Sequence, residues 1–220
     1  MRSMSIFVTA VLVAAVAFAP ACKKSAEGSG SAKGSSAPAA AAAPAGPAVP
    51  AFQSKELAFG EVKMKAFVPE GWEEKIEAGS FARARYLSPD YNATFEIGET
   101  CGGICEASHW TENAKTDAKD QLEFLNDPER YQPAADVEVK QDGETAPGTY
   151  VLYANTKPKD PKAGGLAEVR LSVWRYGPDW EEIVTCRFEG PIEYAATADA
   201  ALKACTDIQR LGPATPQSGN

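Results

Sequence analysis

The sequence predicts an α+β domain, in which a largely antiparallel sheet is flanked by helices, after a disordered N-terminal segment. Three observations predict this class. Strand patterns follow one another through short turns, and two segments show the three- to four-residue apolar spacing of helices. Strands and helices do not alternate strictly, which argues against a dinucleotide-binding fold. Strands joined by tight turns pair antiparallel, so the helices are expected to pack on the faces of the sheet.

The first half of the domain contains three strand patterns and one helix pattern. Apolar and polar residues alternate over 61–68, and a Pro-Glu-Gly turn ends that strand. Further strands are predicted over 81–87 and 93–97. A helix is predicted from Trp110 to Leu125, because apolar residues recur there at helical spacing and an Asn-Asp-Pro sequence follows.

The second half adds strands and a closing helix. A short strand is predicted over 137–139, and stronger strand patterns cover 149–155, 167–176 and 180–188. The last helix is predicted over 195–211. Its apolar stripe consists of Ala198, Ala201, Leu202, Cys205 and Ile208.

The N-terminus has the layout of an export signal. Arg2 precedes an apolar run over 6–18, which as a helix would rise about 20 Å, too short for the roughly 30 Å of a bilayer core. Small residues and a proline follow this run. Residues 1–21 are therefore predicted to be a cleaved signal peptide and not part of the fold.

Cys22 follows Ala19-Pro20-Ala21, and this junction resembles a bacterial lipobox, in which the cysteine carries the lipid anchor. Two observations favour lipidation at Cys22: the other four cysteines are even in number, and a spacer follows. Several acyl chains give stable anchoring to a membrane. Lys23 after the cysteine resembles outer-membrane sorting, facing the periplasm. The alternative is an ordinary signal-peptidase cut at the same bond, which would give a secreted or soluble periplasmic protein.

The mature chain is predicted to have three parts. Residues 22–50 are the lipidated cysteine and a flexible tether, because their Ala, Gly, Ser and Pro content cannot form a core. A coil of this length spans about 30 Å. Residues 51–213 are predicted to form one globular domain, and 214–220 a disordered tail.

The domain is acidic. Residues 1–50 hold four basic and one acidic residue of the chain's 22 and 30, which leaves 18 basic and 29 acidic residues, a net charge of −11, in 51–220. Such a domain repels phosphate backbones, so a nucleic-acid partner is not expected.

The four downstream cysteines are predicted to form two disulfides, because an exported chain matures under oxidising conditions. Cys186 lies on the apolar face of its strand and Cys205 on the apolar stripe of the last helix, which favours their pairing. Cys101 and Cys105 would then close the small CGGIC loop, where two glycines allow a tight turn.

A second hypothesis uses the segment 100–110 as a small-ligand or metal site. Cys101, Cys105 and His109 are spaced by four residues and, with Glu106, could hold zinc or copper on one helix face. The two glycines disfavour a helix there, and the disulfide uses the same thiols. No metal, cofactor or catalytic residue is therefore predicted. His109 is the only histidine, which excludes a multi-histidine metal site.

An aromatic group flanks the hairpin after 167–176. Alternation places Arg170, Trp174 and Tyr176 on the strand face opposite its aliphatic residues, and Trp180 follows the turn. One hypothesis makes this group a partner-binding surface, because Trp, Tyr and Arg favour interfaces. The alternative, which we favour, is that a helix covers this face as one layer of a sandwich.

The phrases MKAFVPEGWEE and YLSPDYNATFEI, then a helix, then strands and a helix with an IQRL close, resemble the PsbP/Mog1-like fold. The resemblance covers about 57–211. It implies an α/β/α sandwich that serves as a binding or assembly module, without catalytic residues. Many bacterial envelope lipoproteins are similar to this fold. The expected function is therefore that of a non-enzymatic lipoprotein with a partner protein in the cell envelope.

Overall fold

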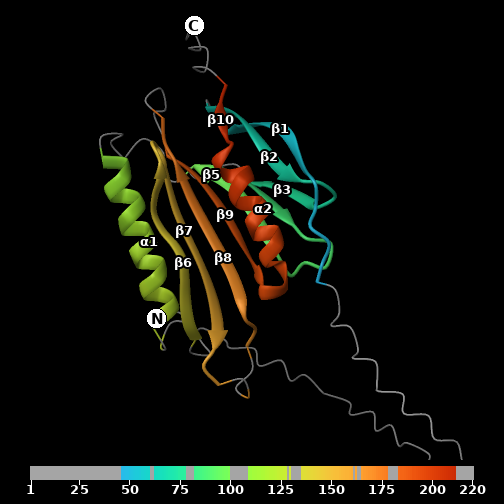
Figure 1. Cartoon of the computed structure of the whole chain (residues 1–220). Helices are drawn as coiled ribbons and strands as arrows, with labels where there is room; N and C mark the ends of the chain where they lie inside the picture. The colour runs from blue at the N-terminus through green and yellow to red at the C-terminus, as the bar shows by residue number, and fades with distance from the viewer. Residues whose placement is uncertain are drawn as a thin grey trace, which may run out of the picture. The chain divides into compact units, whose positions relative to one another are not determined.

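The computed structural model describes residues 46–59, 62–77, 82–99, 109–127, 129, 135–160, 162, 165–177 and 183–211. The predicted α+β class is confirmed (Figure 1). The strands are β1 (Phe52–Phe59), β2 (Val62–Pro69), β3 (Glu73–Glu77), β4 (Arg83–Leu87), β5 (Thr94–Glu99), β6 (Ala135–Ala146), β7 (Thr149–Pro158), β8 (Glu168–Arg175), β9 (Val184–Pro191) and β10 (Gln209–Arg210). The helices are α1 (Trp110–Asn126), α2 (Ala195–Thr206) and the 3-10 turn η2 (Ile192–Tyr194).

The strands form two antiparallel sheets. The larger has the order β3-β4-β5-β9-β8-β7-β6, and the smaller has the order β1-β2-β10. Three strands, β1, β3 and β10, were not predicted. β3 has an exposed side chain at four of its five positions, so it lacks the alternating apolar pattern that reveals a strand. β10 occupies part of the predicted last helix, because α2 ends at Thr206 and Gln209 and Arg210 instead pair with β2.

The main core lies on one face of the large sheet. There α2 and the small sheet cover residues that alternate along the central strands, such as Val151, Leu171 and Phe188. Cys186 of β9 and Cys205 of α2 are joined by a disulfide in this core, with a Cα–Cα distance of 5.6 Å, and both residues are fully buried. The disulfide therefore fastens α2 to the middle of the sheet.

The helix α1 packs on the opposite face, where it contacts β6 and β7 (Figure 1). A second cluster of buried side chains lies beneath it and includes Leu152, Trp174 and Ile183. Two buried alanines of α1, Ala114 and Ala118, let the helix approach this cluster closely. The two helices thus lie on opposite faces of one sheet, as an α/β/α sandwich requires.

The turn between β4 and β5 is fixed by the carboxylate of Asp90. Its Oδ1 atom accepts hydrogen bonds from Ser88 Oγ at 2.6 Å and from Tyr194 Oη at 2.7 Å. The backbone amide of Asn92 also donates to Oδ1, and its side-chain amide donates to Oδ2. These donors hold the pKa of Asp90 well below its ordinary value, with Ser88 making the largest contribution.

Replacing Asp90 by alanine is expected to lower the free energy of unfolding by about 1 kcal/mol at neutral pH, a modest effect because the carboxylate is exposed. A lowered folded-state pKa contributes stability that is fully present above the unfolded pKa, near 4, and is lost as the pH falls through the folded pKa. The difference between wild type and variant should therefore be constant above about pH 5 and shrink towards pH 2. Urea unfolding at several pH values measures this, with Asp136→Ala as the control. A difference that grows on acidification would contradict it.

Candidate functional site

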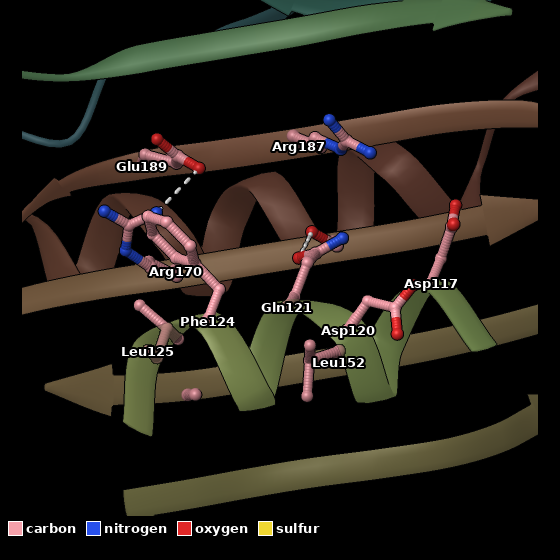
Figure 2. Close-up of a pocket in the computed structure, with 11 residues that line it drawn as sticks. Asp117, Asp120, Gln121, Phe124, Leu125, Leu152, Arg170, Arg187 and Glu189 are labelled. Atoms are coloured by element: carbon pink, nitrogen blue, oxygen red, sulfur yellow. Dashed lines mark hydrogen bonds and ion pairs between the residues drawn. The ribbon is translucent and has the colours of Figure 1, made fainter. Parts of the chain in front are cut away.

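A groove runs between α1 and the sheet on the face opposite the main core. Its volume is about 380 Å³, and its walls come from α1 and from three consecutive strands, β7, β8 and β9. Figure 2 shows α1 along one side and β9 along the other, with β8 between them. The lining residues are Asp117, Asp120, Gln121, Phe124 and Leu125 of α1, Leu152 and Ala154 of β7, Arg170 and Ser172 of β8, and Arg187 and Glu189 of β9.

Polar contacts fix the wall that α1 provides. The indole Nε1 of Trp174 donates a hydrogen bond to Asp117 Oδ2 at 3.2 Å, and the hydroxyl of Ser172 donates to Gln121 Oε1 at 2.9 Å. Asp117 and Gln121 are four residues apart, so they share one side of the helix. This side faces β8, and the two bonds hold the helix at a set distance from the strand. The groove is therefore preformed.

Two cross-strand rows form the floor of the groove and its extension over the sheet. The pairing register aligns Arg85, Glu96, Arg187, Ser172 and Leu152 across β4, β5, β9, β8 and β7. The neighbouring row contains Leu87, Thr94, Glu189, Arg170 and Ala154. Residues opposite one another on paired strands have neighbouring side chains. Basic and acidic groups therefore alternate along the uncovered part of the sheet and give way to apolar residues near α1.

Most charges in these rows are paired. Glu96 binds Arg85 at 3.0 Å and lies 3.6 Å from Arg83, so its carboxylate is turned towards β4. Glu189 binds Arg170 at 3.1 Å, so its carboxylate is turned towards β8, as Figure 2 shows. Both acids thus face away from a third arginine, which lies opposite Glu96 in the first row and two residues from Glu189 along β9.

That arginine is Arg187. Its Nε atom is buried and has no hydrogen-bond acceptor, and within the described part of the chain no carboxylate lies within 4.0 Å of its guanidinium nitrogens. A second hollow of about 300 Å³ over β4 and β5 adjoins the groove and shares Arg187 and Glu189 with it. Arg187 therefore sits where the two hollows meet.

The structure divides the predicted aromatic surface. Trp174 is fully buried under α1, so it is not part of an exposed surface, because the helix covers this end of the strand face. Tyr176 is half-buried and stacks on Trp110, with ring centroids 5.8 Å apart. Arg170 lines the groove. Trp180 lies outside the described residues.

The other predicted site residues lie partly within and partly outside the described residues. Cys186 and Cys205 form the core disulfide described above. Cys22, Cys101, Cys105 and Glu106 lie outside the described residues, so their lipidation, disulfide and metal hypotheses stay predictions. His109 is exposed at the start of α1. Among the residues that the structure describes, no cluster of His, Cys, Asp and Glu could hold a metal ion.

Sequence reasoning missed Arg187, Asp117 and Gln121. Alternation along β9 was visible and places Arg187 on the face opposite Cys186. It did not reveal that α1 would lie over this face on one side only. The polar flank of α1 was equally ambiguous, because any exposed helix side has such residues.

Comparisons with known proteins concern the fold alone. No protein-family model matches the chain, and no curated protein matches it. Several solved structures are similar to the chain. The Ran-binding protein Mog1p of Saccharomyces cerevisiae is 12% identical, with a TM-score of 0.43 over 72% of this chain and 95% of that one.

A Pseudomonas aeruginosa protein of unknown function, described as a putative regulator, is 14% identical, with a TM-score of 0.36 over 73% of this chain and 96% of that one. LpqN of Mycobacterium tuberculosis, which is involved in cell envelope biogenesis, is 10% identical, with a TM-score of 0.41 over 73% of this chain and 92% of that one. Within the described residues, neither helix is long and apolar enough to cross a bilayer.

Proposed function

We propose that this chain is an exported lipoprotein of the cell envelope that binds a partner protein and performs no catalysis. Cys22 carries the lipid anchor, in the outer membrane and facing the periplasm, and the tether over 22–50 sets the reach of the domain. The acidic surface of the domain disfavours nucleic acid and anionic lipid as partners.

The observation that carries the binding role is the preformed groove between α1 and the sheet. Its apolar residues, Leu152, Ala154 and Phe124, lie beside ion-paired polar groups. Recognition surfaces between proteins usually combine apolar side chains with polar groups that stay accessible to solvent. Arg170 and Glu189 of the groove are paired with each other, which favours holding a partner over moving protons.

A photo-crosslinking amino acid at Phe124 should capture the partner in intact cells. Phe124 lines the groove and its side chain is 41% exposed, so an aromatic crosslinker fits there without entering the core. The expected result is a discrete adduct that sediments with membranes and is released from them when Cys22 is replaced by alanine. Immunoblotting of fractionated cells measures both.

The matched control places the same crosslinker at Ile76 of β3, which is 61% exposed and does not line the groove. Adducts should form at position 124 and not at position 76. Equal yields at the two positions, or no adduct at either, would contradict the groove as the binding site. An adduct that stays soluble with Cys22 intact would contradict the anchor.

A further inference from the structure

The positive charge of Arg187 has no counter-ion within the described part of the chain. A guanidinium stays protonated at every physiological pH, so its charge cannot be removed by losing a proton. Its neighbours in the cross-strand row and along β9, Glu96 and Glu189, bind Arg85 and Arg170 instead. The guanidinium therefore lacks the carboxylate partner that the other arginines of this sheet face possess.

The Nε atom of Arg187 is a second polar group of this side chain that has no partner in the described part of the chain. Its Nε atom is removed from solvent without an acceptor, and an unmet buried donor of a charged group is costly. An incoming carboxylate can accept from the terminal nitrogens of this guanidinium, and a paired geometry with a carboxylate is the one that arginine favours. Figure 2 shows Arg187 on β9, across the groove from Asp117 and Gln121 of α1.

The surroundings of Arg187 limit what can bring this carboxylate. Leu152 and Phe124 line the same groove, so the ligand needs an apolar part beside its acid group. Asp117, Asp120 and Glu189 also line it, and they would repel a doubly charged phosphate more strongly than a singly charged carboxylate. The chemistry favours an acidic side chain or terminal carboxylate next to apolar residues.

The dimensions of the two hollows favour a polypeptide as the source of the carboxylate. Hollows of about 380 and 300 Å³ meet at Arg187 and Glu189, and both are open to solvent along the sheet. Small-molecule sites instead enclose most of their ligand in one concave pocket. An extended segment can lay its carboxylate on Arg187 and its apolar side chains against α1.

We propose that Arg187 anchors a carboxylate of an acidic, partly apolar segment of the partner protein. This inference rests on the proposed binding function and names the chemistry that the groove recognises. Specificity for the segment comes from a single ion pair between its carboxylate and Arg187. Among the described residues, Arg187 is the arginine of the two cross-strand rows that has no carboxylate partner.

Selection from a random peptide display library, with the full chain as bait, tests the proposal. The wild-type protein should enrich peptides with an Asp or Glu, or a free C-terminus, beside apolar residues. The selected peptide should bind Arg187→Gln about tenfold or more weakly, because a charge-assisted hydrogen-bonded pair is lost. Replacing the acidic residue of the peptide by its amide should weaken binding to the wild type by a similar factor and to Arg187→Gln by much less.

Lys119→Gln is the charge-matched control, because Lys119 lies on α1, is 75% exposed and does not line the groove. It should bind the selected peptide like the wild type, and circular dichroism should show that both variants are folded. Enrichment without acidic residues, or equal binding by Arg187→Gln, would overturn the proposal. So would N-acetylglutamate competing as well as the peptide, or failure to enrich any peptide. If the peptide experiment fails in one of these ways but the crosslinker at position 124 still captures a protein in cells, the proposed binding function stands and only the role of Arg187 is rejected.

Discussion

Replacing Trp174 by alanine is expected to lower the free energy of unfolding by about 3–5 kcal/mol, the largest effect of any single substitution considered for this chain. Trp174 is fully buried between β8 and α1, where its ring packs edge-on against Tyr150 at a centroid distance of 5.9 Å. Truncation removes the centre of the cluster under α1 and leaves a cavity that the small alanines of the helix cannot fill. Urea unfolding followed by circular dichroism measures the change.

Two variants separate packing from other effects. Trp174→Phe keeps an aromatic six-membered ring but loses the pyrrole part of the indole and its hydrogen bond to Asp117, so it should cost roughly 1–2 kcal/mol. Phe124→Ala, at a half-exposed position of the same helix, should cost less than about 1 kcal/mol. A Trp174→Ala variant within about 1 kcal/mol of the wild type would mean that α1 is not docked on the sheet.

Removing the core disulfide should also have a large effect. The Cys186→Ala/Cys205→Ala double variant is expected to lose about 3 kcal/mol, because the crosslink closes a loop of 19 residues in the unfolded chain. Alanine is used because both positions are buried and the packing of α2 on β9 should otherwise persist. Urea unfolding of the oxidised wild type and the double variant measures the difference.

The matched control is the Cys101→Ala/Cys105→Ala variant, which retains the core disulfide. Its stability should still fall when reductant is added, whereas the stability of the Cys186→Ala/Cys205→Ala variant should respond much less. If reductant lowers both variants equally, or leaves the wild type unchanged, the link between α2 and β9 does not contribute as expected.

The two stability predictions bear on the groove in different ways. α1 forms one of its walls, and Trp174 holds α1 in place through Asp117. The disulfide acts on the other face and does not touch the groove. Trp174→Ala should therefore weaken binding by the groove, whereas loss of the disulfide should lower stability with little effect on binding while the domain stays folded.

The sequence by itself determined the fold class and the faces of the main elements. Alternation along 167–176 assigned Val169 and Leu171 to one face of β8 and Arg170 and Trp174 to the other, as the structure has them. The stripe of the last helix placed Cys205 towards the sheet. Such periods are local, because the position of a side chain on a strand or helix follows from its neighbours in the chain.

Strands without an alternating apolar pattern could not be predicted from the sequence. β3 is exposed at most of its positions, and β10 has only two residues, so neither carries a pattern of its own. β6 is much longer than predicted, since its many charged residues hide the alternation of an edge strand. The pairing partners that stabilise these strands lie elsewhere in the sequence.

The groove was decided only by the tertiary structure. The alternation of β9 places Arg187 on a face, but strand order makes Glu96 its neighbour, and further ion pairs turn Glu96 towards Arg85 and Glu189 towards Arg170. Likewise, only the docking of α1 buried Trp174 and left Arg170 in the groove. Whether a charge is paired, or a face covered, depends on contacts between residues distant in the chain, and no local pattern encodes those contacts.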